Sequence, residues 1–359
     1  MQYLRQIFIA LLFVAISQSS TAEDVNTDHA TEFDPMEMIM HHIGDTHEWH
    51  VFAYTDSNQE QHHFTIPLPI ILINNGVIHF FLSSAFHHGE AVVKKGNFYY
   101  KLYHEKIYIT DSNGTIQYDE SHQVINEKPW DLSITRNVAS MWLSIILILL
   151  LFISAARKYK AEPQTPRGLQ SFLEPLILFV RDDIAVAQIG KDKAGKFMPY
   201  LLTLFFFIWI NNLIGLIPFF PGGSNLTGNI SLTLVLALIT FFVTNISGSK
   251  SYWGHIFWMP GVPVPIRLLL SVIEFIGLFT KPFALMIRLL ANITAGHIII
   301  LSLFSLIFVM KSVAIAPVSI LMALMMFMLE LLVAVLQAYI FTLLSALFIG
   351  MAVHEEEHH

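Results

Sequence analysis

Polar side chains interrupt two long apolar segments in the last third of the sequence. The segments are 281–303 and 318–353, and their polar residues include Arg288, Asn292, His297, Glu330 and Gln337. An arginine at the centre of a membrane helix costs roughly 2.5–3.5 kcal/mol, so such a residue usually faces a bundle interior or a water-filled path. We therefore predict that Arg288 is functional, and not a surface arginine that extends to the headgroups.

His297 and Glu330 are candidates for proton exchange. If the two segments form an antiparallel hairpin that turns near Val313, residues equally far from the turn lie at equal depth. His297 is then level with Glu330, and Arg288 is level with Gln337. An imidazole beside a carboxylate at low dielectric favours the charged form of each partner, which makes a proton-accepting pair. An arginine that faces an amide keeps its charge with fewer lost hydrogen bonds.

Glu274 adds an ionisable group on the other side of the arginine. On a helix that rises about 1.5 Å per residue, Glu274 lies about 21 Å before Arg288, and His297 lies about 13–14 Å after it. The total is close to the roughly 30 Å of the hydrocarbon core. We therefore expect Glu274 toward the cytoplasm, Arg288 near mid-depth and His297 toward the outside. Segment 318–353 is about 54 Å long as a helix, so the hairpin must tilt strongly.

The composition is that of a polytopic membrane protein. Of the 359 residues, 54% are hydrophobic and only 13% are charged, which argues against an ordinary soluble domain. The formal net charge is −7, but the position of lysine and arginine matters more than their sum in a membrane protein. The sequence has no cysteine, which excludes disulfides and thiolate metal sites.

The N-terminus has the pattern of a secretory signal peptide. Arg5 precedes the apolar core Ile7–Ile16, and the small residues Ser20 and Ala22 follow. The apolar run is too short to span a bilayer. We predict a signal peptide over residues 1–22 that is cleaved after Ala22, with a retained amphipathic anchor as the alternative. Cleavage would leave the mature N-terminus in the periplasm.

Residues 23–135 are the predicted exported region. Alternating apolar and β-branched patterns and turn signals predict short strands, so a small β-rich domain is plausible. The strand patterns are at 79–82, 97–103 and 106–110, and the turn signals are Asn75-Gly76 and Asn113-Gly114. Twelve of the seventeen histidines fall here, including the pairs 41–42, 62–63 and 87–88. No spacing matches a defined metal site, so we expect solvated or structural histidines, with metal binding or pH sensing as the alternative.

About five membrane helices are expected in residues 136–353. The first apolar spans are near 138–156, 197–220 and 230–246, and the hairpin supplies the others. The basic run 157–160 after the first span places its end in the cytoplasm. Residues 169–189 predict an amphipathic surface helix. The predicted fold is an all-α polytopic membrane protein with a long tilted antiparallel hairpin and a cytoplasmic tail at 354–359.

Two short motifs suggest other chemistry but lack necessary parts. Gly190–Lys196 has the spacing of a phosphate-binding loop, yet Phe197 stands where Ser or Thr should hold magnesium, and no strand precedes it. The tail His354–His358 has the spacing of a zinc-protease helix but offers no third ligand and no closed site. We therefore predict no cofactor, no metal and no nucleic acid partner.

The polar pattern of the hairpin resembles a known family. Lys281-Pro282-x5-Arg288-x3-Asn292-x4-His297, followed by Glu330-x6-Gln337-Ala338-Tyr339-Ile340-Phe341, looks like subunit a of the rotary ATP synthases. Asn212-x2-Gly215-Leu216-Ile217-Pro218 is similar to the family's second span. The resemblance covers about 137–353. Leu290-Ala291 replaces the commoner Phe-Gly, and the His and Glu positions are exchanged relative to some bacterial members.

The resemblance implies roles for the polar residues. Arg288 would be the essential stator arginine facing a rotating ring of subunit c, and Glu274 would belong to the cytoplasmic half-channel. The half-channel open to the outside would be lined by Asn292, His297, Glu330 and Gln337. The resemblance also implies a bacterial inner-membrane subunit that is not catalytic alone and that works with the c-ring, subunit b of the peripheral stalk and the rest of the synthase. Proton flow would drive rotation and ATP synthesis.

Two other functions stay open from the residues. A secondary ion transporter would also bury ionisable side chains, but it usually shows internal repeats with paired broken helices, and the sequence has no such repeat. A membrane-anchored, histidine-rich metal-binding protein would use the spans only as an anchor. That function leaves Arg288 and Glu330 unexplained.

Overall fold

The structure is a computed structural model. It describes residues 35, 36, 39, 43–55, 61–121, 123–161, 168–217, 220–259 and 262–354, with the backbone only for 52–55, 61–63, 160, 161 and 313. The chain divides into the units Met1–Asp34 and Pro35–His359, and the described residues all belong to the second. The predicted signal peptide, the histidine pair at 41–42 and the tail beyond His354 lie outside the described residues.

The first part of the described chain forms short antiparallel strands. Their hydrogen-bonded orders are β1-β2, β4-β3-β8 and β5-β6-β7. Their bounds are β1 Glu48–Thr55, β2 Gln61–Pro67, β3 Pro69–Asn74, β4 Val77–Leu82, β5 Val93–Lys95, β6 Phe98–Tyr103, β7 Lys106–Thr110 and β8 Trp130–Asp131. Three of the predicted strands lie within or next to β4, β6 and β7. The strands make three small separate sheets, however, and the structure does not support a single β-rich fold here.

A short helical turn packs the second and third sheets together. This turn, η1 (Ser83–Gly89), follows β4 directly. Its Phe86 and the Tyr100 side chain of β6 are fully buried with Ile70 and Leu72 of β3. Ring contacts between Phe81 and Phe86 add to this core, with centroids 5.5 Å apart. The buried aromatic rings therefore hold two sheets that share no strand.

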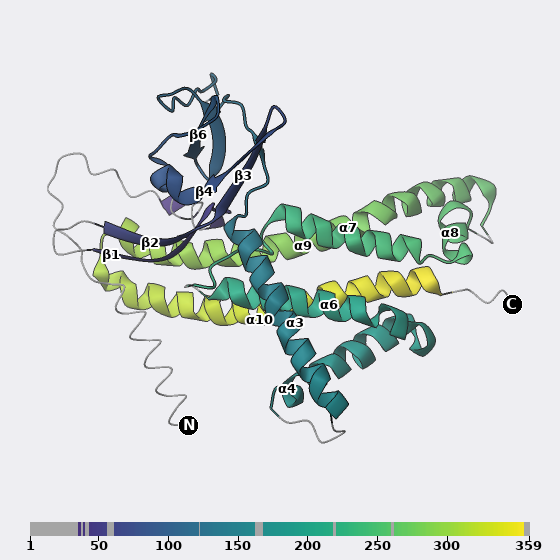
Figure 1. The fold of residues 1–359 in the computed structure, drawn as a ribbon. Coiled ribbons are helices and arrows are strands. Elements are labelled where there is room, and N and C mark those ends of the chain that lie inside the picture. The colour runs from purple at the N-terminus through teal and green to yellow at the C-terminus, as the bar shows by residue number, and fades with distance from the viewer. Residues whose placement is uncertain are drawn as a thin grey trace. The chain divides into compact units, whose positions relative to one another are not determined.

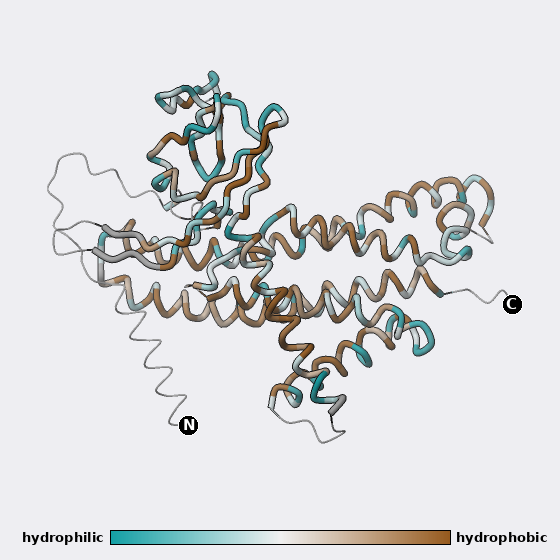
Figure 2. The backbone as a smooth tube through the Cα atoms, in the orientation of Figure 1, coloured by the Kyte–Doolittle hydropathy of each residue, from teal (hydrophilic) through white to brown (hydrophobic). Residues whose placement is uncertain are grey.

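Helices make up the rest of the described chain (Figure 1). Their bounds are α3 Arg136–Ala161, α4 Leu169–Phe179, η2 Val180–Val186, α5 Ala187–Ile189, α6 Lys191–Leu216, α7 Ile230–Ile246, α8 Lys250–Phe257, α9 Val264–Val309, η3 Val313–Ile315 and α10 Ala316–Val353. Within the described residues, α3, α6, α9 and α10 are long and apolar enough to cross a membrane, and the bent pair α7–α8 makes up to five spans. Figure 2 shows apolar residues along these helices. The predicted polytopic helical membrane fold is confirmed.

The second span differs from its predicted bounds of 197–220. Helix α6 begins at Lys191, directly after Gly190 with its positive φ of 90°, and Asp192 in its first turn favours the positive end of the helix dipole. It ends at Leu216, because Ile217 is extended, as expected for a residue before a proline. Apolar run length alone therefore placed this span too far toward the C-terminus.

The predicted surface helix at 169–189 is helical but interrupted by a π-helical stretch. Helix α4, η2 and α5 follow one another without a gap. Val180 and Ile184 are fully buried in the same core as α6 and α10, whereas Arg181 and Asp182 are exposed and form an ion pair of 2.8 Å. One face therefore packs on the bundle, and the charged face is free.

Helices α9 and α10 run side by side as a hairpin (Figure 1). The turn lies at η3, where it was expected, and Lys311 just before it has a positive φ of 47°. Helix α9 is continuous through Pro282. Small residues of α10, including Ala338 and Ala346, are fully buried in the core shared with α6, which lets these helices approach closely.

Candidate functional site

His297 of α9 and Glu330 of α10 face each other in the hairpin. The Nε2 atom of His297 lies 3.7 Å from Oε1 of Glu330, and their side chains are 16% and 3% exposed. Neither carboxylate oxygen of Glu330 has a hydrogen-bond partner among the described residues. A buried carboxylate without such partners is costly as an anion, so Glu330 is suited to hold a proton or to contact water. The pairing agrees with the register predicted from the sequence.

Gly296 makes room for the carboxylate of Glu330. A Cβ atom at this position would lie 2.7 Å from Oε1 and 2.9 Å from Cδ of Glu330, closer than carbon and oxygen atoms pack. On α6, a Cβ at Gly215 would lie 3.0 Å from the carbonyl oxygen of Ser224 and 3.9 Å from Nε2 of His297. Both glycines therefore open space around the acid–base pair.

A polar pocket borders the pair. Helices α6, α9 and α10 and the loop before α7 line it, through Asn211, Asn212, Gly215, Leu216, Ser224, Asn225, Thr227, Ile293, His297, Glu330 and Ala334. The Oδ1 atoms of Asn211 and Asn225 are buried and lack a hydrogen-bond partner among the described residues. Buried polar atoms without partners are rare in folded proteins, so this cluster stands out as a polar site.

The polar wall of this pocket is held by buried hydrogen bonds. Asn212 donates from Nδ2 to the carbonyl oxygen of Ala334 at 3.2 Å, and it accepts from the hydroxyl of Thr227 at 2.6 Å. The hydroxyl of Ser224 donates to Oδ1 of Asn137 at 2.7 Å. The network therefore connects α3, α6, α10 and the loop before α7 around one polar space.

Sequence reasoning missed several residues of this wall. Asn211, Asn225 and Thr227 carried no predicted role, and Asn212 was used only for the family resemblance. The adjacent amides Asn211-Asn212 inside an apolar helix gave a usable signal, because buried polar side chains need partners. The contribution of the loop carrying Asn225 and Thr227 depends on a tertiary contact, which sequence periodicity does not encode.

Arg288 and Asn292 lie on an exposed face of α9. Their exposed neighbours on this face are small, namely Ala284, Ala291 and Ala295. Within the part of the chain that the structure describes, the guanidinium of Arg288 has no ion-pair partner. A cation at membrane depth is costly unless it is paired or reaches water, and small residues beside it allow another helix to approach closely.

Gln337 is buried, and its contact with Arg288 differs from the expected one. Its Nε2 atom donates to the backbone carbonyl oxygen of Arg288 at 3.5 Å, at the long limit for a hydrogen bond. This contact involves the backbone of Arg288, whose residue as a whole is exposed. Gln337 therefore lies level with Arg288 as predicted, but it supports the helix backbone and not the charged group.

Glu274 is separated from the other candidates along α9. It is partly buried and lies two turns before Lys281 on the same helix. Lys281 lines a second pocket together with Thr244, Asn245 and Tyr252. Glu274 is not among the described residues that line either pocket. The chain therefore presents two polar regions along the hairpin, with Arg288 between them in sequence.

The fold and these positions define a class: a polytopic α-helical membrane protein that carries ionisable side chains within its spans. In the described residues, no group of three or more His, Asp or Glu side chains could hold a metal ion. The family model described as "ATP synthase A chain" matches residues 138–350. The chain therefore belongs to the ATP synthase A chain family.

Individual relatives lead to the same family. The chain is similar to "ATP synthase subunit a" of Chloroherpeton thalassium, at 49% identity over 234 residues that cover 64% of this chain and 69% of that protein. The protein of the same name from Chlorobium phaeobacteroides strain BS1 is 47% identical over 237 residues, 64% of this chain and 68% of its own. The protein of the same name from Anaeromyxobacter sp. strain Fw109-5 is 46% identical over 240 residues, which cover 64% of this chain and 57% of that protein.

The strand-containing part of the chain matches a different family model. That model is described as "Domain of unknown function (DUF8433)" and covers residues 38–132. This match ends at residue 132 and the other begins at residue 138, and α3 begins between them at Arg136. The part of the chain before α3 is therefore not covered by the membrane family.

Proposed function

We propose that this chain is the proton-conducting stator subunit of a rotary ATP synthase. In this role two offset half-channels and one arginine act against a ring of subunit c, so that proton flow drives rotation and ATP synthesis. The single observation that carries the proposal is the arrangement of α9. Its exposed face carries Arg288, which has no ion-pair partner among the described residues, and its inner face brings His297 to Glu330 of α10.

The route to the outside uses the polar pocket. A proton entering it reaches His297 and Glu330, which lie 3.7 Å apart, and passes from there toward Asn292 and the ring. The unsatisfied oxygens of Asn211 and Asn225 offer hydrogen-bond acceptors at this level. Gln337 steadies the segment of α9 that carries the arginine.

Arg288 keeps the two routes apart. Its guanidinium stays protonated at physiological pH, so it cannot relay a proton. A ring carboxylate that approaches it is stabilised as an anion, because a neighbouring cation lowers a carboxylate pKa by about 1–3 units. The anion stays on the stator side, and the protonated form can enter lipid.

The second route leads to the cytoplasm. Glu274 and the pocket beside Lys281 lie on the other side of Arg288 along α9. A ring site that has nearly completed a revolution loses its proton here. Each charge that crosses is worth about 2.3 kcal/mol per 100 mV, and the offset between the two routes turns this energy into rotation.

Topology and partners follow from the same assignment. With five spans, the N-terminus lies in the periplasm and the C-terminus in the cytoplasm, and the basic run after α3 lies inside, as the positive-inside rule requires. The domains would be a signal peptide at 1–22, an exported region at 23–135, the membrane domain at 136–353 and a tail at 354–359. The ring, subunit b and the rest of the synthase are the expected partners in a bacterial inner membrane.

Substitution of Arg288 tests the proposal. In proteoliposomes that contain the complete complex, Arg288→Ala should abolish ATP synthesis driven by an imposed proton gradient. Arg288→Lys should also fail, since a lysine in a dry site can lose its proton. Synthesis at nearly the wild-type rate by assembled Arg288→Ala complex would refute the proposed function. Copurification of the other subunits serves as the control for assembly.

A further inference from the structure

The sheet β4-β3-β8 is apolar on both faces. Ile70 and Leu72 of β3 are fully buried in the core on one face. Ile71 and Ile73 alternate with them and therefore point to the opposite face. An antiparallel sheet with one face in water normally shows polar residues there. This second face is apolar, which calls for something that covers it.

This outer sheet face is defined by six residues. They are Ile71 and Ile73 of β3, Ile78 and Phe80 of β4, and Trp130 and Leu132 at β8. In the registers of the sheet, Ile73 pairs with both Ile78 and Trp130, and Ile71 pairs with Phe80. The N–H of Leu132 donates to the carbonyl oxygen of Ile71 at 2.9 Å. The six side chains therefore form two rows across three strands.

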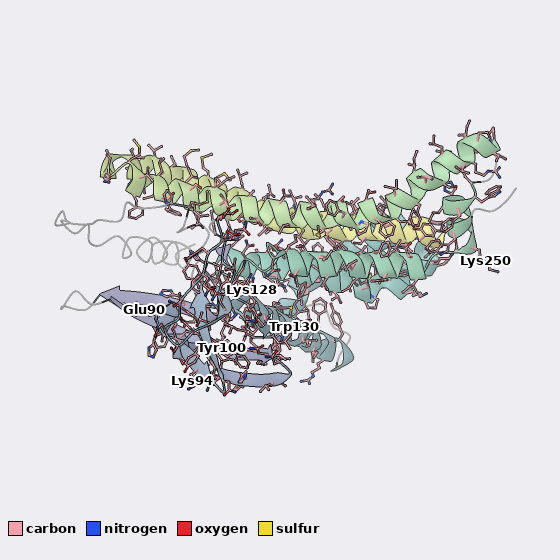
Figure 3. The ribbon with its side chains drawn as sticks, turned by 90° about the horizontal axis from the view of Figure 1, so that it is seen from above. Glu90, Lys94, Tyr100, Lys128, Trp130 and Lys250 are labelled. Carbon is pink, nitrogen blue, oxygen red and sulfur yellow. The ribbon has the colours of Figure 1, made fainter. Side chains whose placement is uncertain are left out.

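Four of the six side chains of the outer sheet face are well exposed in the part of the chain that the structure describes. Trp130, Ile78, Phe80 and Leu132 are 78%, 66%, 64% and 60% exposed, and Trp130 is labelled in Figure 3. With strands about 4.8 Å apart, three strands measure roughly 10 Å across. None of the six side chains is charged. Isolated exposed apolar residues are ordinary, but a contiguous patch marks an interaction surface.

Backbone hydrogen bonds fix the short segment that connects this face to the start of α3. After Leu132, the N–H of Ile134 donates to the carbonyl oxygen of Pro69 at 3.0 Å. The N–H of Arg136 donates to the carbonyl oxygen of Thr46 at 2.9 Å. Arg136 is the first residue of α3. Leu132 is four residues away, roughly 13 Å in an extended chain. No free linker separates the outer sheet face from the end of a membrane span.

We propose that the outer sheet face contacts lipid in the membrane leaflet at the N-terminal end of α3. Helix α3 exposes Trp142, Ile146 and Leu150, as a lipid-facing span does, and the outer sheet face continues this apolar surface. Tryptophan is enriched where a membrane meets water. A face without charged side chains, whose one hydrogen-bonding group is the indole N–H of Trp130, suits acyl chains better than a protein partner, whose interface would add a polar rim.

The proposal depends on α3 being a span, but not on the role of Arg288. It gives residues 43–135 a second attachment to the membrane besides their covalent connection to α3. That attachment would hold the sheets at the membrane surface, beside the N-terminal end of α3. At this end Asn137 accepts a hydrogen bond from Ser224 in the loop that lines the polar pocket.

Spin labelling in the full chain tests the lipid contact. The sequence has no cysteine, so Phe80→Cys, Leu132→Cys, Ile125→Cys and Trp142→Cys each give one labelling site in lipid nanodiscs. Ile125 is an apolar control that is 56% exposed outside this sheet, and Trp142 is the lipid-facing control. Collision rates are measured with molecular oxygen, which concentrates in lipid, and with a water-soluble nickel chelate.

Labels at Phe80 and Leu132 should behave like the label at Trp142. We expect them to collide with the chelate roughly tenfold less often than the label at Ile125, because burial of a large apolar side chain favours the lipid-contacting state by a factor of this order. Free access of the chelate to both sites would overturn the proposal. Protection from chelate and oxygen together would also overturn it, and would indicate a protein covering.

Discussion

At the scale of single residues, the acid–base pair depends on a missing side chain. Glu330 fits between α9 and α10 because Gly296 has no Cβ atom. An added Cβ would lie 2.7, 2.9 and 3.2 Å from Oε1, Cδ and Cγ of Glu330. The glycine is therefore as much a part of the site as the two ionisable residues. It follows that the smallest possible substitution should disturb the pair.

Gly296→Ala should move the Glu330 carboxylate away from His297. Misplacement of a reacting group by about 1 Å can cost on the order of a hundredfold in rate, and we expect at least a roughly tenfold loss of proton-driven ATP synthesis in assembled complexes. Gly277→Ala on the same helix is the matched control, because its Cβ would meet no atom within 4 Å. Equal activity of the two variants would show that the position of Glu330 does not matter.

A second residue pair concerns the stability of the sheets. His47 donates from Nε2 to Oδ2 of Asp131 at 2.9 Å, and the N–H of Ser133 donates to Oδ1 at 2.9 Å. Burial alone would raise the pKa of Asp131, but the hydrogen bonds from His47 and Ser133 outweigh it, so the pKa lies below the ordinary value of 3.8. A carboxylate with a lowered pKa stabilises the folded state above its unfolded pKa, and the effect is lost as the pH falls through the folded value.

Asp131→Asn should therefore be destabilising at pH 7 and less destabilising at pH 3, because the stabilisation declines as the pH falls below 3.8. The change in stability is measured by thermal unfolding of the purified full chain. Tryptophan fluorescence reports it, because Trp130 is adjacent to Asp131 in the sequence. Asp119→Asn is the control, since Asp119 bonds only within its own turn, to the N–H groups of Ser121 and Gln123. The same loss of thermal stability at both pH values would contradict the assigned role of the carboxylate.

At the scale of elements, Asp45 joins the first part of the chain to the first span. Its Oδ1 accepts from the N–H of Asn137 at 3.0 Å, and its Oδ2 accepts from the hydroxyl of Thr135 at 2.9 Å. A carboxylate at this position satisfies a free N–H group of the helix and favours the positive end of its dipole. Asp45 therefore caps α3 from a distant part of the sequence.

Asp45→Ala should loosen the start of α3. Loss of a capping side chain costs about 1 kcal/mol, or roughly a fivefold change in the opening equilibrium. Hydrogen–deuterium exchange at Arg136 and Asn137 should accelerate by that factor. Asp111→Ala is the control, because Asp111 makes comparable hydrogen bonds only to Asn113 and Thr115 in its own turn. Unchanged exchange at α3 would rule out the capping role.

The hairpin was largely predictable from the sequence, and the polar pocket was not. Counting outward from the turn near Val313 brings His297 level with Glu330, because a helix has a fixed rise per residue. Counting residues could not predict on which side of the helix Arg288 would lie. It suggested Gln337 as a partner of the Arg288 side chain, whereas Gln337 contacts the backbone. Nor could it place Asn225 beside the pair, since a loop position depends on tertiary packing.

At the scale of the whole molecule, the spans support the sites in different ways. Helices α6 and α10 pack closely through a buried core, whereas α9 is largely exposed along the face that carries Arg288. The close packing of α10 on α6 can hold Glu330 and the polar pocket in place, and the exposed face of α9 can meet a moving partner. This division of roles is what a stator against a rotating ring requires.

The central claim is that Arg288 prevents protons from passing directly between the two routes. The most direct measurement is the decay of an imposed pH gradient in proteoliposomes that contain the complete complex without nucleotide turnover. We predict that the gradient decays faster with Arg288→Ala than with the wild-type chain, because protons bypass rotation. Decay at the wild-type rate in the assembled variant would contradict the account.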